Sequence, residues 1–368
     1  MLKDDLFVRG DPFTYFFVAR LKWSPSLITF LFSLLTSVPI FVGVTVAHAW
    51  HSQGGRIGLL DDYSFWPIMF LSTPATVLFF LWLPRGILEV IEGLQINKVL
   101  VDEDERLSQF LQRFDRKYNH WIWATVAFCL VALYMAVFAL PEHKSFRTWE
   151  TASSFLLWYM IIFWTVVFWI GSTLILRAGL VLYFFNRLFR EFQIDVRVLH
   201  PDGAGGLSSL GAFSVKVGYI LGIYGVAAVS ATLTQSYRTT GQFSGVSLSG
   251  ALLTQLILYV ILAPIAFFAP IGAARNAMRA AKNELLLQIS DQFEIDSARL
   301  GTLIKGDVEE LKKGLEKLEQ LEKLHGMVNR FPVWPFNTAN IVRFFSSISS
   351  PFVLWLLSVL VDLLKSYR

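Results

Sequence analysis

The residues best suited to chemistry lie in one glycine-rich segment, "HPDGAGGLSSLG", at positions 200–211. Glycine adopts backbone angles closed to other residues, so successive N–H groups can converge on one point and bind an anion. A helix that begins just after the segment would add a positive field. The members of this predicted loop, which would bind a small anionic ligand or couple a signal to the membrane part, are Arg197, His200, Asp202, Gly203, Gly205 and Gly206. The alternative is a Pro-Asp-Gly turn that leads into a close helix contact.

The loop has neither of the two common nucleotide-binding patterns. No Gly-Lys-Ser/Thr closes it, and no strand–turn–helix dinucleotide pattern surrounds it. We therefore expect no cofactor and predict no catalytic residues.

A basic stripe that follows two prolines is the second candidate. The prolines each remove a helical hydrogen bond, so we expect a kink near the cytoplasmic end of this apolar segment. The three basic residues recur at helical spacing, and in a symmetric oligomer they would form positive rings that favour anions. The pore and gate candidates are Pro264, Pro270, Gly272, Arg275, Arg279 and Lys282. The alternative is a flanking segment that meets anionic lipid headgroups.

A third group of side chains falls in the loops on the opposite side. Histidine and carboxylate together can bind a divalent metal or respond to pH. The members of this metal candidate are His48, His51, Asp61, Asp62 and His143. The alternative is an ordinary set of interfacial polar residues.

The composition indicates which elements must position these residues. Hydrophobic residues make up 54% of the chain and charged residues only 16%, with 33 Phe and 12 Trp, which excludes an ordinary soluble domain. Open backbone cannot face lipid, so the fold class is all-α and polytopic. The lone cysteine, Cys129, is expected as a small buried hydrophobe.

Six segments are long enough to cross a bilayer core as helices. They are residues 26–48, 65–83, 121–140, 155–176, 213–235 and 250–272. Lys and Arg number 27 in the termini and alternate loops on one side, against 4 on the other. The positive-inside rule therefore places the N-terminus in the cytoplasm. The high pI follows from this topology, and no nucleic-acid partner is expected.

The chain divides between membrane and cytoplasm. The predicted parts are a cytoplasmic segment 1–25, helices one and two in 26–84, a helical arm 85–119, helices three and four with an extension in 120–186, the glycine-rich loop in 187–211, helices five and six in 212–274, a helical cytoplasmic region 275–336 and an apolar helix in 337–368. This last helix either packs on the membrane or on a subunit, or it is a seventh span.

Two further features narrow the function. Small residues Gly218, Gly222 and Gly225 mark one face of span five and predict close helix packing. The central parts of the spans contain no Asp or Glu, which argues against an ion-coupled transporter.

Residues 200–207, "HPDGAGGL", and 334–336, "WPF", carry a loose resemblance. The pattern resembles bacterial polytopic membrane proteins with an HPDxxGGL cytoplasmic loop and a C-terminal WPF turn. The resemblance implies a bacterial source and a shared architecture, and it brings no activity with it.

The sequence thus predicts an oligomeric channel of the bacterial inner membrane, preferentially permeable to anions and gated from the cytoplasm. Its partners would be the lipid bilayer, further copies of the chain, and a cytoplasmic protein or small anionic ligand. The first alternative is a non-conducting anchor whose cytoplasmic helices recruit a partner. The second is an interfacial enzyme that uses the outer cluster around His48.

Overall fold

The computed structural model describes residues 7, 14–100, 104–140, 148–192, 194–198, 200–240, 250–303, 308–334 and isolated positions between 342 and 357. Within these ranges the chain is helical and contains no β-strand, which confirms the predicted all-α class. His143 and most of segment 337–368 lie outside the described residues.

The helices follow one another along the chain with short connections. The α-helices are α2 (Pro25–Val46), α3 (Phe65–Pro67), α4 (Thr73–Ile96), α5 (Asp104–Tyr118), α6 (Ile122–Tyr134), α8 (Ser154–Glu191), α9 (Ser208–Thr240), α10 (Gly250–Leu303) and α11 (Val308–Asn329). Short π-helical or 3₁₀ segments are η2 (Tyr15–Arg20), η3 (Leu59–Asp61), η4 (Ile68–Ser72), η5 (Met135–Ala139) and η6 (Trp149–Thr151).

Five helical segments are long and apolar enough to cross a membrane. They are Pro25–Val46, Phe65–Ile96, Glu105–Phe138, Ser154–Glu191 and Ser208–Leu233. The sixth predicted span forms the first part of α10, and its crossing stays a prediction.

Local chemistry explains where the spans begin and how their polar residues are tolerated. The Ser24 hydroxyl accepts a hydrogen bond from the Leu27 N–H at 3.2 Å and caps α2, which has Pro25 in its first turn. Inside α2, Thr29 donates to the carbonyl of Pro25 at 2.8 Å and Thr36 to that of Phe32 at 2.8 Å. Hydroxyls that return to the preceding turn leave no unsatisfied polar group toward lipid.

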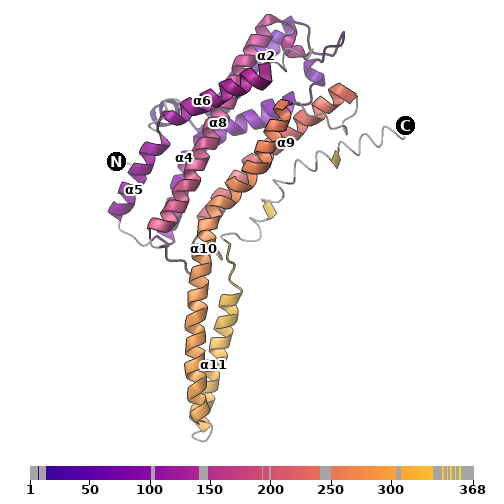
Figure 1. The fold of residues 1–368 in the computed structure, drawn as a ribbon. Coiled ribbons are helices and arrows are strands. Elements are labelled where there is room, and N and C mark those ends of the chain that lie inside the picture. The colour runs from indigo at the N-terminus through magenta and orange to yellow at the C-terminus, as the bar shows by residue number, and fades with distance from the viewer. Residues whose placement is uncertain are drawn as a thin grey trace, which may run out of the picture.

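Helix α4 occupies the middle of the bundle, between α2, α8 and α9 (Figure 1). Its residues Leu83, Ile87 and Leu94 are at most 1% exposed. The outer faces of the surrounding helices remain apolar, with Leu35 of α2 75% exposed and Trp158 of α8 64% exposed. Such surface is costly in water and suited to lipid. Cys129 belongs to this outer surface and is exposed, so its predicted burial is wrong.

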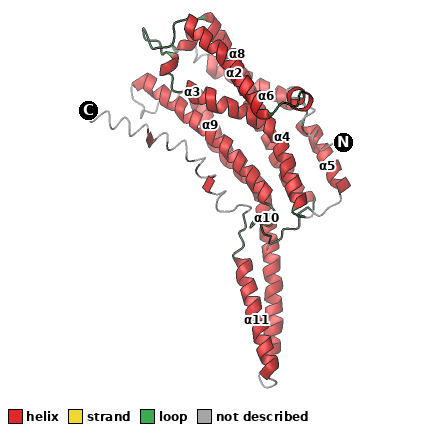
Figure 2. Cartoon of the chain, turned by 180° about the vertical axis from the view of Figure 1, so that it is seen from behind, coloured by secondary structure: helices red, strands yellow, loops and turns green. Residues whose placement is uncertain are grey.

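Helices α10 and α11 form an antiparallel hairpin that extends beyond the bundle, as both views show (Figures 1 and 2). An α-helix rises about 1.5 Å per residue, so the 54 residues of α10 span about 80 Å. Asp296 and Lys317 pair across the hairpin at 2.7 Å. A Cβ at Gly314 would lie 2.6 Å from Leu300 Cδ2, so glycine permits the two helices to approach there.

Leucines recur every three or four residues along α11, at positions 311, 315, 318, 321 and 324, and they lie on two surfaces. Leu321 and Leu324 pack against the main core, and Leu311 and Leu318 are half-buried. Leu315 is 56% exposed and does not contribute to that packing.

A buried indole contact lies at the end of the bundle that carries η3 and η6. The Trp149 side chain is fully buried and its Nε1–H donates to Asp62 Oδ2 at 3.0 Å. Asp62→Ala should lower the free energy of unfolding by about 1–3 kcal/mol, because it leaves this buried indole donor without its acceptor. Thermal unfolding of the detergent-solubilised chain measures the loss.

The adjacent Asp61→Ala is the matched control. Asp61 accepts from the exposed Ser52 hydroxyl at 2.6 Å, a group that water can satisfy. Equal losses in the two variants would contradict a special role for the buried indole contact.

Candidate functional site

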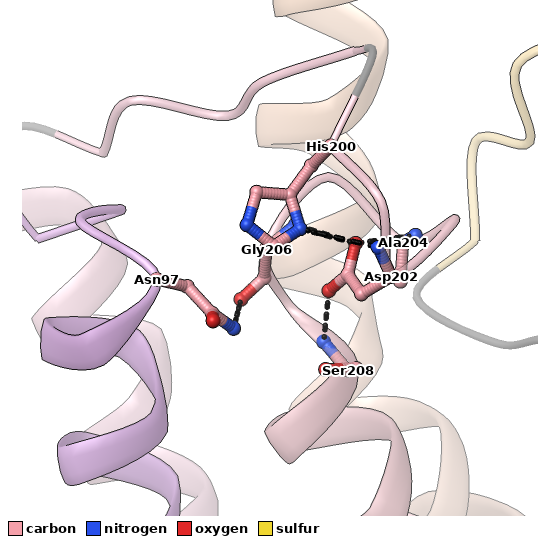
Figure 3. A network of polar contacts seen from close by, with 6 residues as sticks. All are labelled: Asn97, His200, Asp202, Ala204, Gly206 and Ser208. Carbon is pink, nitrogen blue, oxygen red and sulfur yellow. Dashed lines mark hydrogen bonds and ion pairs between the residues drawn. The ribbon is translucent and has the colours of Figure 1, made fainter.

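The glycine-rich loop folds around the carboxylate of Asp202 (Figure 3). Asp202 Oδ1 accepts from the N–H groups of Ala204 at 2.9 Å and Gly206 at 3.0 Å, and Oδ2 accepts from Ser208 N–H at 3.2 Å. His200 Nδ1 lies 2.8 Å from Asp202 Oδ1. We predicted that the converging backbone N–H groups would bind an external anion. In the structure they donate to the Asp202 carboxylate, which belongs to the loop itself.

These bonds hold Asp202 ionised. Burial alone would raise its pKa, but the N–H groups of Gly206 and Ala204, with His200 and Ser208, bring the pKa below the ordinary 3.8. Ser208 begins α9, so the carboxylate also lies at the N-terminus of that helix and is favoured by its dipole.

Positive φ angles explain why the loop needs glycine. The φ angles of Gly203, Gly205 and Gly206 are 66°, 67° and 88°. A Cβ at Gly206 would lie 2.3 Å from Val99 Cγ2, and one at Gly205 would lie 2.6 Å from Val196 Cγ1. The glycines thus provide the turn and the close approach of neighbouring segments together.

The loop connects three parts of the molecule. Asn97, just after α4, donates from Nδ2 to the Gly206 carbonyl at 2.8 Å. Asp195 N–H donates to the Val99 carbonyl at 2.8 Å. The ring of Phe331, just after α11, approaches to 3.2 Å of a Cβ position at Gly205. The loop therefore lies at the junction where α4 and α9 meet the root of the hairpin.

Arg197 lies at the edge of this junction. Its Nε is 3.4 Å from Asp195 Oδ2, and both side chains are half exposed. The charge that the sequence analysis assigned to ligand binding is thus partly compensated by a neighbouring carboxylate.

The three basic residues of α10, Arg275, Arg279 and Lys282, differ in their surroundings. Lys282 Nζ donates to the carbonyls of Asn329 at 2.7 Å and Phe331 at 3.2 Å, at the end of α11. A cation commonly satisfies the last carbonyls of a helix in this way. Arg275 stacks on the ring of Trp334, 4.5 Å from its centroid. Arg279 is exposed and makes no ion pair within the described residues.

Among the side chains of α10 that the structure describes, one face carries exposed residues from the bundle to the hairpin. Its members, at successive spacings of three or four residues, are Ile257, Ile261, Pro264, Phe268, Gly272, Arg275 and Arg279. We call them the α10 stripe. The two isoleucines and the phenylalanine are each about half exposed.

Both predicted hinge prolines, Pro264 and Pro270, lie inside α10, which continues through them without interruption. The helix changes direction between bundle and hairpin in both views (Figures 1 and 2). The small residues Gly218, Gly222 and Gly225 are buried on α9, which packs against α10 and α4. Tyr224 of that helix lies 2.5 Å from Thr76 Oγ1 of α4.

The outer carboxylates have structural partners. Asp62 accepts from Trp149 and from the Ser64 hydroxyl at 2.6 Å, and Asp61 accepts from Ser52. The Ser52 bonds lower the pKa of Asp61. Among the described residues, which include His48 and His51 but not His143, no group of three His, Cys, Asp or Glu is arranged to hold a metal ion.

Sequence reasoning missed the environment of Arg177. Arg177 lies within α8 and is only 7% exposed. Its guanidinium lies 4.9 Å from the ring centroid of Phe80 and 5.1 Å from that of Tyr118. An arginine within a long apolar helix is the sequence signal for such an interior contact. No sequence pattern of this kind indicates that Trp334 stacks on Arg275.

Compared with known proteins, the sequence matches no family model, and it matches no curated protein and no solved structure. The site is therefore interpreted from its own geometry.

Asp202→Asn tests the carboxylate. Replacing the anion should lower the free energy of unfolding at pH 7 by about 2 kcal/mol, since hydrogen bonds to a charged acceptor are the stronger ones. A lowered folded pKa stabilises the fold above the unfolded value of about 3.9, and this part is lost as pH falls through the folded pKa. The difference in Tm between wild type and variant should therefore narrow below about pH 4.

Asp195→Asn is the control for this measurement, because Asp195 is half exposed. It should change Tm little at either pH. A difference at Asp202 that is independent of pH would contradict the assignment to its charge.

Gly206→Ala tests the close approach to α4. The added methyl meets Val99 and must also adopt a positive φ, so we expect a loss of about 2–4 kcal/mol in unfolding free energy. Gly203→Ala shares the positive φ but meets no atom within 4 Å, and should cost only about 1 kcal/mol. Similar Tm values for the two variants would contradict a packing requirement at Gly206.

Proposed function

We propose that the chain is a homo-oligomeric membrane channel, preferentially permeable to anions, with α10 along the pore. The observation that carries the proposal is the α10 stripe: its apolar members lead directly into Arg275 and Arg279 on the same face. Repeated around an axis, such a stripe gives an apolar constriction and then positive rings. An apolar constriction gates by losing its water, and positive rings favour anions.

The hairpin provides the route for a cytoplasmic signal. Lys282 connects α10 to the end of α11, and Phe331 leads from there to Gly205 in the loop. The loop in turn begins α9 through the bond between Asp202 and Ser208. A partner or ligand that moves the hairpin would therefore move the helix that packs beside the pore helix.

Trp334 is the proposed gate residue. Its ring lies against Arg275 and, at 6.4 Å between centroids, against Phe268, so it covers the inner end of the α10 stripe. Displacement of this ring would expose the guanidinium to permeating ions.

The first experiment measures the mass of the complex in nanodiscs and its flux in liposomes. A closed ring of subunits with ion flux supports the proposal. A monomer, or a ring that conducts nothing when Trp334 is replaced by Ala, overturns it.

Arg279→Glu tests charge selection, since Arg279 makes no ion pair within the described residues. The reversal potential under a KCl gradient should shift from the equilibrium potential of chloride toward that of potassium. One charge contact in water is worth about 1 kcal/mol, so reversing its sign should change the permeability ratio by at least about tenfold. Lys312→Glu, an exposed charge reversal on α11, should leave the ratio unchanged.

A second candidate is a non-conducting anchor that recruits a protein through the hairpin. It is favoured by exposed apolar side chains on the hairpin, with Leu287 64%, Ile295 63% and Leu315 56% exposed. Absence of flux, together with a partner whose binding to the full chain is lost in Leu287→Ser/Ile295→Ser, would select this candidate over the channel.

A further inference from the structure

A basic and aromatic depression lies between α5 and the cytoplasmic end of α8, away from the α10 stripe. Helix α5 has one apolar face, and its Phe110 and Phe114 lie 5.2 Å and 4.3 Å, between ring centroids, from Phe184 of α8. This aromatic packing fixes α5 beside α8 and brings the polar edges of the two helices together.

Three cations and a phenol surround the depression. Arg113 and Lys117 extend from successive turns of α5, and Tyr183 and Arg187 from successive turns of α8. Lys117 Nζ lies 5.8 Å from the ring centroid of Tyr183. Arg187 Nη1 donates to Tyr183 Oη at 3.3 Å, so the phenol proton remains available to an acceptor.

The charge at this place is only partly compensated. Arg187 pairs with Glu191 through Nε. Within the described residues, neither Arg113 nor Lys117 forms an ion pair with a carboxylate, and both are exposed. Asp115 of the same helix is engaged elsewhere, by Phe7 N–H at 2.7 Å and Asn119 Nδ2 at 2.8 Å.

The depression lies at the level where lipid headgroups are expected. Trp121, at the start of α6, is 68% exposed, and Trp123 Nε1 donates to the Lys117 carbonyl at 2.8 Å. Tryptophans of this kind mark the membrane–water interface. On α8, exposed Ile162 and Trp169 share a face with Tyr183, so the surface beside the acyl chains continues into the depression.

We propose that Arg113, Lys117, Tyr183 and Arg187 bind the phosphate of an anionic phospholipid in the leaflet that meets α5, the cytoplasmic one in the predicted orientation. The guanidinium groups and the ammonium group donate to phosphate oxygens, and the phenol adds a fourth donor. The acyl chains lie along the exposed row of α8. Basic pockets between helices on the cytoplasmic side bind such headgroups. The bound lipid would hold α5 against α8.

The experiment compares two lipids on the full chain in detergent, at fixed salt, by native mass spectrometry. The probes are phosphatidylglycerol and phosphatidylcholine with identical acyl chains. Wild type should retain phosphatidylglycerol preferentially. Arg113→Ala/Lys117→Ala should weaken its binding by about fivefold for each charge removed, with phosphatidylcholine binding unchanged.

Arg116→Ala is the matched control, because Arg116 is an exposed charge on α5 that does not line the depression. It should retain the preference of the wild type, and Lys117→Arg should retain it as well. The Tm of each variant in lipid-free detergent shows whether it is folded, since none of these changes touches the buried face of α5.

Three results would overturn the proposal. One is equal loss in Arg116→Ala, which would indicate unspecific attraction by charge. Another is equal retention of the two lipids by the wild type. The third is displacement of phosphatidylglycerol by inorganic phosphate at comparable concentration, which would assign the site to a soluble anion.

Discussion

The Asp202 carboxylate is the contact on which the junction of the molecule depends, because it accepts hydrogen bonds from three backbone N–H groups of a loop whose own backbone forms isolated turns and no helix or strand. Buried amides without partners are costly, so a loop this tight requires an internal acceptor. With the acceptor in place, Gly206 can lie against Val99 and Gly205 against Phe331. The start of α9, the end of α4 and the root of the hairpin then hold fixed positions relative to one another.

Helix α10 continues from the bundle into the hairpin without interruption. A single helix of 54 residues transmits a displacement along its length more directly than helices joined by a flexible linker. Lys282 and Trp334 add contacts at the point where α10 leaves the bundle. The proposed gating route uses these contacts together with those of Phe331 with Gly205 and of Asp202 with Ser208.

The basic residues predicted to lie on the cytoplasmic side have several kinds of partner, which a count of Lys and Arg does not distinguish. Arg177 is enclosed by aromatic rings, Lys282 satisfies helix-terminal carbonyls, and Lys216 pairs with Glu89 at 2.9 Å. Arg113 and Arg279 are exposed and form no ion pair within the described residues. Basic residues thus contribute to packing and, in our proposals, to topology and to the recognition of anions.

The all-α class and the approximate location of five apolar helices follow from the sequence alone, because hydrophobic length and composition are local properties. It also located the glycine-rich turn, since positive φ restricts residue choice locally. It does not show that the backbone N–H groups of that loop donate to Asp202, or that Arg177 is buried between the rings of Phe80 and Tyr118. Both contacts depend on the distance between groups on separate segments, and periodicity along one helix contains no information on that distance.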